Sequence, residues 1–296
     1  MSEKKRIDFS ANKTIQLNNK NCPYCSVMLT DDIASKEHVI GRRFVPRGYL
    51  HGQWNLILKA CNKCNDAKSD LEDDISAITL AGYQYFNSDK SNIFISNDVK
   101  RKIKNSFSRK TRKLVKDSQE ELEIKGSLTK QVNIGFNLVS PPQVNPDRAF
   151  KLACLQMMAF FYYITYDCNS RKGRFWTGGF HPVEVAIQPD WGNSTQRYFM
   201  DSVLNWDFRW IGITASGFYK SIIRRHPNEE CFSWAIEWNK YFRLIGFFGN
   251  RCVAQKIVNS FPVMKRNLLS MSDNTVIRYR QEIELDEKND SLFNID

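Results

Sequence analysis

The first part of the chain places short apolar runs between polar stretches in an order that predicts two strands and a helix. Residues 39–40 and 56–58 are β-type apolar runs, and the segment between them contains proline and glycine. From Asn65 onward, apolar residues recur at helical spacing as far as Ile78. The pattern therefore predicts a strand, a loop, a second strand and a helix.

The second half of the chain has longer apolar segments. A helix that begins near Asp147, which can serve as its N-cap, is apolar on almost all sides and should be buried. A shorter helix is expected at residues 194–205. Four β-type runs follow, at residues 210–214, 218–223, 231–238 and 241–248. The last two should form a hairpin joined at Asn239-Lys240, and the alternation over residues 277–285 predicts an edge strand.

These patterns divide the chain into three parts. Residues 1–80 form an N-terminal module, residues 81–145 a helical, basic connector, and residues 146–296 a C-terminal domain. Prolines at the end of the connector mark the second boundary. The expected fold class is α+β, with a strand–loop–strand–helix module followed by the connector and by a C-terminal α+β domain that contains an antiparallel sheet.

The composition is that of a folded protein without a membrane anchor. Of the 296 residues, 42% are hydrophobic and 13% aromatic, enough for a sizeable core. The polar N-terminus has no apolar segment like that of a signal peptide. The longest apolar run, residues 152–164, is too short to span a bilayer. We therefore expect a soluble, cytoplasmic protein.

The charge balance favours an acidic partner. The net charge is +11 and the isoelectric point is near 9.2, which suits the phosphate backbone of DNA. Residues 100–116 are rich in lysine and arginine and contain no acid. This run is either a solvated helix face or a surface that follows phosphates. The candidate nucleic-acid contacts in it are Lys100, Arg101, Lys102, Lys104, Arg109, Lys110, Arg112 and Lys113.

Four of the eight cysteines occur in two C-x-x-C pairs, Cys22 with Cys25 and Cys61 with Cys64. Two such pairs can turn four sulfurs toward one point and form a tetrahedral zinc site. Because a site with four thiolates has no open coordination position, this zinc should be structural. The other cysteines are scattered among apolar neighbours, as buried free thiols usually are.

The segment enclosed by the two pairs contains groups suited to catalysis. His38 can act as a general base because its unperturbed pKa lies near neutrality. Glu37 precedes it, and Asn65 follows the second cysteine pair. Both residues offer the hard oxygen ligands that a magnesium-like ion prefers.

Glu37-His38, Asn55 and Asn65, set between and beside the two cysteine pairs, resemble the HNH (ββα-metal, or His-Me finger) endonucleases, in the subgroup with two zinc-binding C-x-x-C pairs. The resemblance implies that His38 activates water, that Glu37 and Asn65 hold a catalytic Mg²⁺ or Mn²⁺, and that Asn55 fixes the loop that orients His38. It also makes Lys68 a nucleic-acid contact. The chain departs from the family in having glutamate where aspartate is more common, and asparagine at a position where histidine also occurs.

The expected function is therefore metal-dependent hydrolysis of DNA phosphodiester bonds, as HNH nucleases perform in bacterial and phage defence or in restriction. Two alternatives stay open. The chain could be a zinc-dependent nucleic-acid-binding protein that does not cleave. It could also be a nuclease effector that is activated through a partner or ligand of the C-terminal domain, which could also bring together copies of the chain.

Overall fold

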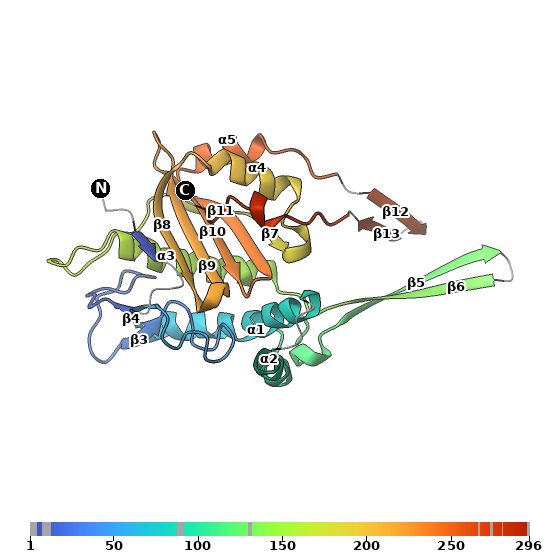
Figure 1. Ribbon diagram of the computed structural model, residues 1–296, viewed down its shortest axis with the longest axis horizontal. Helices are drawn as coiled ribbons and strands as arrows, with labels where there is room; N and C mark the ends of the chain where they lie inside the picture. The colour runs from blue at the N-terminus through green and yellow to red at the C-terminus, as the bar shows by residue number, and fades with distance from the viewer. Residues whose placement is uncertain are drawn as a thin grey trace.

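A six-stranded sheet lies at the centre of the molecule, and helices cover both of its faces (Figure 1). The computed structural model describes residues 5–7, 13–87, 92–129, 132–265, 267–272, 275–279 and 281–294. The strands of this sheet are β1 (Lys5–Ile7), β7 (Gly179–Ile187), β8 (Asp207–Thr214), β9 (Tyr219–Arg225), β10 (Cys231–Trp238) and β11 (Phe242–Gly249). Their order is β1-β8-β9-β10-β11-β7, and only the β1–β8 pair is parallel.

The four strands expected in the second half of the chain are β8 to β11, and the expected hairpin joins β10 to β11. Asn239 and Lys240 have φ of 54° and 53°. Positive φ at both central residues is the geometry of the two-residue turn that matches strand twist, and asparagine tolerates it well. The fold class is α+β with antiparallel sheets, as predicted.

The central sheet is buried on both faces: every residue of β10 and β11 is buried, and most of their side chains are apolar. In β10, Trp234 and Ile236 belong to one hydrophobic cluster. Cys231 and Ala235, which point the other way, belong to a second cluster. Each face therefore needs its own covering layer of helices.

Three helices form most of these layers. The first face is covered by α3 (Pro146–Ile164), and the opposite face by α4 (Ser194–Val203) and α5 (Arg251–Asn259). The cap of α3 is Asn145 rather than the expected Asp147: its side chain accepts a hydrogen bond from the Arg148 amide at 3.2 Å. Pro146 at the first helical position explains the earlier start, because its fixed φ suits a helix and it needs no amide partner.

The N-terminal module forms the expected strand–loop–strand–helix arrangement, with different boundaries. The pieces are β3 (Ala34–His38), β4 (Leu56–Cys61) and α1 (Asn62–Phe86), and β2 (Ile15–Gln16) pairs with β4 in parallel. Residues 39–40 were expected in the first strand, but they follow it as the buried start of the loop. Helix α1 begins at Asn62, three residues before Asn65. Cys61 is both the last residue of β4 and the N-cap of this helix.

One hydrophobic core runs from this module to the central sheet, and Trp54 joins the two. Its indole is fully buried, lies edge-on to Trp210 at 5.7 Å, and donates a hydrogen bond to the Ile213 carbonyl at 2.6 Å. The Thr214 hydroxyl donates to the Trp54 carbonyl at 2.8 Å. The core is therefore continuous across the boundaries expected at residues 80 and 145.

The connector differs from the helical segment that the sequence predicts. It contains α2 (Ile93–Asn105), which packs against α1, and then a hairpin of β5 (Glu120–Thr129) and β6 (Val132–Ser140) that projects from the body (Figure 1).

A second projecting hairpin pairs β12 (Asn267–Ser272) with β13 (Thr275–Tyr279). Of the edge strand expected at residues 277–285, residues 277–279 form the end of β13, which pairs with β12 rather than with the central sheet, and residues 281–285 lie outside any strand. Among the described residues, no helix combines the length and apolarity needed to cross a membrane.

We expect Trp54→Ala to lower the free energy of unfolding by about 3–5 kcal/mol, because it leaves a large cavity where the module meets the sheet. Urea unfolding followed by fluorescence and by circular dichroism measures this loss. Both probes should report one shared transition. The control is Tyr85→Ala, since this tyrosine is 72% exposed. Separate transitions for helix and sheet signals would contradict a continuous core.

Candidate zinc-braced site around His38

The four cysteines of the C-x-x-C pairs lie together. Cys22 and Cys25 are in a tight turn that follows Asn21, Cys61 ends β4, and Cys64 is in the first turn of α1. Their sulfurs all lie within 4.8 Å of one another, and the Cys25 and Cys61 sulfurs are 3.6 Å apart. Sulfurs about 2.3 Å from a central zinc in a tetrahedron are separated by roughly 3.8 Å. The cluster can therefore hold a metal ion such as zinc.

The surroundings of the thiols make metal binding depend on pH. Burial raises the pKa of the Cys22 thiol to about 11, and burial also raises the pKa of the Cys64 thiol. Such thiols stay protonated at neutral pH unless a cation stabilises their thiolates. Metal binding should therefore release protons and weaken as the pH falls.

His38 is the last residue of β3 and pairs with Ile57 of β4, whereas Cys61 of the cluster pairs with Ala34 at the other end of β3. Its imidazole is partly buried, and Nε2 accepts a hydrogen bond from Nε of Arg42 at 3.2 Å. Burial lowers the pKa of His38, and the positive charges of Arg42, Lys36 and Lys68 lower it further. His38 is therefore mainly neutral at pH 7 and able to accept a proton.

Asn55 binds the backbone of the loop that follows His38. Its buried side-chain amide donates to the Ile40 carbonyl at 2.8 Å and accepts from the Ile40 amide at 3.3 Å. These two bonds close the base of the loop directly after His38. The backbone that leaves β3 is therefore held in one position.

Glu37 does not lie where a metal ligand was expected. Its carboxylate is buried, and Oε1 is 2.8 Å from the Lys68 ammonium and 3.0 Å from the Tyr24 hydroxyl. The same ammonium lies 2.6 Å from Glu72 and donates to the His38 carbonyl at 3.1 Å. A cation, Lys68, is thus already bound between the two carboxylates.

The residues expected to hold magnesium or manganese therefore do not fit that ion in this arrangement. The Asn65 amide donates to the Ser35 hydroxyl at 2.9 Å, while the Glu37 carboxylate is paired with Lys68 and Tyr24. Within the described ranges, the four cysteines are the one group of three or more Cys, His, Asp or Glu side chains close enough to share an ion.

Two of the predicted nucleic-acid contacts, Lys68 and Lys102, are wrong because both side chains are buried. The side chains of Lys68 and Lys102 are 1% and 7% exposed, so neither can reach a phosphate from its position. Burial lowers the Lys68 pKa, but the charges of Glu72 and Glu37 outweigh this effect and raise it above its usual range. Both lysines pack their apolar stems in the interior and bind buried partners with their ammonium groups.

The other residues of the basic run are more accessible. Arg109 is partly exposed and pairs with Asp70 at 2.8 Å, and Arg101 pairs with Asp98 at 2.6 Å. The exposed residues among the predicted contacts are Lys100, Arg101, Lys104, Lys110, Arg112 and Lys113. They remain candidates for contact with a polyanion.

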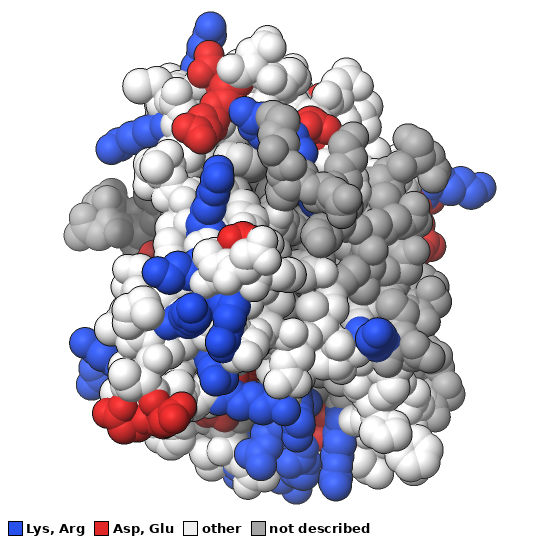
Figure 2. Space-filling model, turned by 90° about the vertical axis from the view of Figure 1, so that its left-hand side faces the viewer, with Lys and Arg blue, Asp and Glu red and all other residues white. Residues whose placement is uncertain are grey.

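Sequence reasoning missed a second group of cations, of which Arg42 contacts His38. Arg42, Arg43 and Arg47 are exposed on the loop between β3 and β4. Figure 2 shows lysine and arginine gathered along the lower part of the face on the β3 and β4 side. The sequence does place three arginines within ten residues of His38. The longer basic run at residues 100–116 drew the prediction instead.

Comparisons with protein-family models, with curated proteins and with solved structures found no match to this chain.

We expect purified protein to contain one zinc per chain, bound by four sulfurs at about 2.3 Å, as measured by elemental analysis and X-ray absorption. Cys25→Ser should yield misfolded or insoluble protein, because metal binding contributes directly to folding. Cys252→Ser is the control, since that exposed cysteine lies outside the cluster. Zinc-free protein with native stability would contradict this expectation.

Lys68→Met should lower the free energy of unfolding by about 3–5 kcal/mol, because it leaves the Glu37 carboxylate buried without its cation. Denaturant unfolding in the presence of zinc measures the effect. Lys63→Met, on the exposed side of the same helix, should change the same quantity by less than about 0.5 kcal/mol. Equal effects of the two substitutions would show that the buried ion pair contributes little.

Proposed function

We propose that this protein is a nuclease that hydrolyses phosphodiester bonds of nucleic acid, with His38 as its general base. The observation that carries the proposal is a neutral, partly exposed imidazole at the end of β3, next to a loop that presents three arginines. The strand–loop–strand–helix order and the cysteine cluster behind it support the same reading, since they match the pattern expected of the HNH family. The net charge of +11 suits a polyanionic substrate.

In this reaction, His38 takes a proton from water as the water oxygen attacks phosphorus. The bond from phosphorus to the leaving sugar oxygen breaks, and that oxygen takes a proton from solvent. Arginines beside the site stabilise the charge that develops on the phosphate oxygens. Asn55 holds the loop at the end of β3, and the four cysteines, with a metal ion bound, would hold the end of β4 and the start of α1 in fixed positions.

Arg42 couples substrate binding to the base. A neutral imidazole has one lone pair, and in the described arrangement Nε2 uses it to accept from Arg42. Because the Arg42 side chain is exposed, it can turn toward an incoming phosphate and leave Nε2 open to water. The base therefore becomes available when an anion occupies the site.

A divalent cation would supply Lewis-acid activation of the phosphate. Because Lys68 already neutralises Glu37 and Glu72, we assign no step of the reaction to such an ion.

The ion pair between Lys68 and Glu37 favours a second candidate function, that of a nucleic-acid-binding protein that does not cleave. With Glu37 engaged by Lys68, the module retains its fold and its basic surface whether or not it catalyses hydrolysis. A cleavage assay distinguishes the two, because only the nuclease depends on His38.

We expect His38→Ala to reduce cleavage of supercoiled plasmid by about 10²-fold or more, the usual scale for a lost general base. Zinc content and DNA affinity should stay near those of the unmodified protein, because His38 is not a zinc ligand. His226→Ala, on the far side of the sheet, should cleave normally. Assays with EDTA, Mg²⁺ and Mn²⁺ are run in parallel.

The rate should also rise with pH through the pKa of His38 and then level off, because only the neutral imidazole accepts a proton. Since the pKa of His38 is lowered, the midpoint should lie below 6.5, the value for an unperturbed histidine. Cleavage by His38→Ala at the unmodified rate would refute the nuclease proposal.

A further inference from the structure

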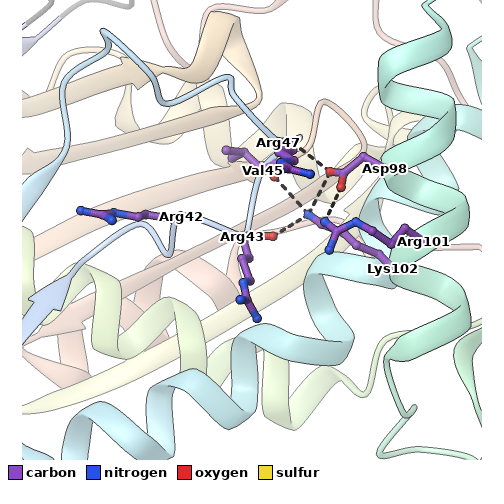
Figure 3. Close-up of a pocket in the computed structure, with 7 residues that line it drawn as sticks. All are labelled: Arg42, Arg43, Val45, Arg47, Asp98, Arg101 and Lys102. Carbon is purple, nitrogen blue, oxygen red and sulfur yellow. Dashed lines mark hydrogen bonds and ion pairs between the residues drawn. The ribbon is translucent and has the colours of Figure 1, made fainter.

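A pocket of about 350 Å³ lies between the loop after β3 and helix α2 (Figure 3). Seven residues line it: Arg42, Arg43, Val45, Arg47, Asp98, Arg101 and Lys102. Five of these side chains are cationic and one is anionic. The pocket is separate from the cysteine cluster and from the Glu37–Lys68 pair, and it is not explained by either.

Two buried charged side chains on α2 build the pocket. The Lys102 ammonium donates to the carbonyls of Arg43 and Val45, the latter at 3.0 Å. The Asp98 carboxylate accepts from the Arg47 amide at 2.9 Å. Both side chains are more than nine-tenths buried. They hold the loop by its backbone, which leaves the arginine side chains of the loop available for other contacts.

The pocket has an excess of positive charge. Asp98 lies 3.7 Å from Lys102 and 2.6 Å from Arg101, so the one carboxylate is shared between two cations. The guanidinium groups of Arg43 and Arg47 have no acidic partner among the described residues. Figure 3 shows Arg43 extending away from the buried Lys102 and Asp98. This excess of cationic side chains is suited to an anion.

Arg42 connects the pocket to the candidate base. It lines the pocket and also donates to Nε2 of His38. Beyond the pocket, α2 continues with exposed Lys100 and Lys104. The positive charge thus extends from His38 through the pocket and along the helix, which suits an extended polyanion better than a small single anion.

We propose that this pocket binds a backbone phosphate of a nucleic-acid strand, one that neighbours the phosphate attacked at His38. The inference rests on the proposed nuclease function for the identity of the strand. Arginine recognises phosphate with paired donors, so Arg43 and Arg47 would fix the register of the strand without reading its sequence. The pocket is thus a positioning site.

The test measures binding to a fluorescent DNA duplex by anisotropy, at several salt concentrations, in full-length protein carrying His38→Ala, in which the proposed function predicts slow cleavage. Adding Arg43→Ala and Arg47→Ala should raise Kd by about tenfold or more. The slope of log K against log salt should fall by about one unit, as for one lost phosphate contact. The charge-matched control adds Arg251→Ala and Lys256→Ala on α5, at the opposite side of the molecule, and should change Kd less than twofold.

Equal Kd and slope in the pocket and control variants would overturn the proposal. Competition by inorganic phosphate at concentrations similar to those of the DNA phosphates would also overturn it, because the pocket would then be a small-anion site. The nuclease function is tested separately by plasmid cleavage. Reduced binding in the pocket variant, together with full cleavage by His38→Ala alone, would keep the phosphate site and reject His38 as the base.

Discussion

The position of His38 depends on the buried ammonium group of Lys68. Lys68 reaches from α1 to the Glu37 carboxylate on β3 and to the carbonyl of His38, and it is also paired with Glu72. Glu72 in turn accepts from the Gly41 amide at 3.2 Å, and a side chain at position 41 would clash with that carboxylate. Helix, strand and loop are therefore held in one register, because moving any of them would leave a charge buried without its partner.

The loop that follows is fixed by a second set of buried polar contacts. The Ser76 hydroxyl donates to the Phe44 carbonyl at 2.8 Å, and Lys102 and Asp98 bind the same segment from α2. Because these contacts use the loop backbone, the arginine side chains remain at the surface. The loop therefore has a fixed shape, set by the two helices that pack against it, and presents a row of cations next to His38.

The sequence predicted the local features and several of the site residues. The cysteine spacing indicated a metal cluster, and the apolar runs indicated the four antiparallel strands and their hairpin turn. It did not predict the pairing of Glu37 with Lys68, since the two residues are 31 positions apart and each is compatible with exposure to solvent. It also placed Lys102 on a charged surface, whereas the structure buries its ammonium against loop carbonyls.

Local pattern was enough for the elements of this protein because periodicity, turn residues and paired cysteines act over a few neighbouring positions. Tertiary structure alone decided which charges face solvent. A lysine or glutamate has the same local preferences whether it is buried in an ion pair or exposed, and the outcome depends on partners that the fold brings together. Packing of α1 and α2 against the loop turned Lys68 and Lys102 inward and left Arg42, Arg43 and Arg47 exposed, with Arg42 against His38.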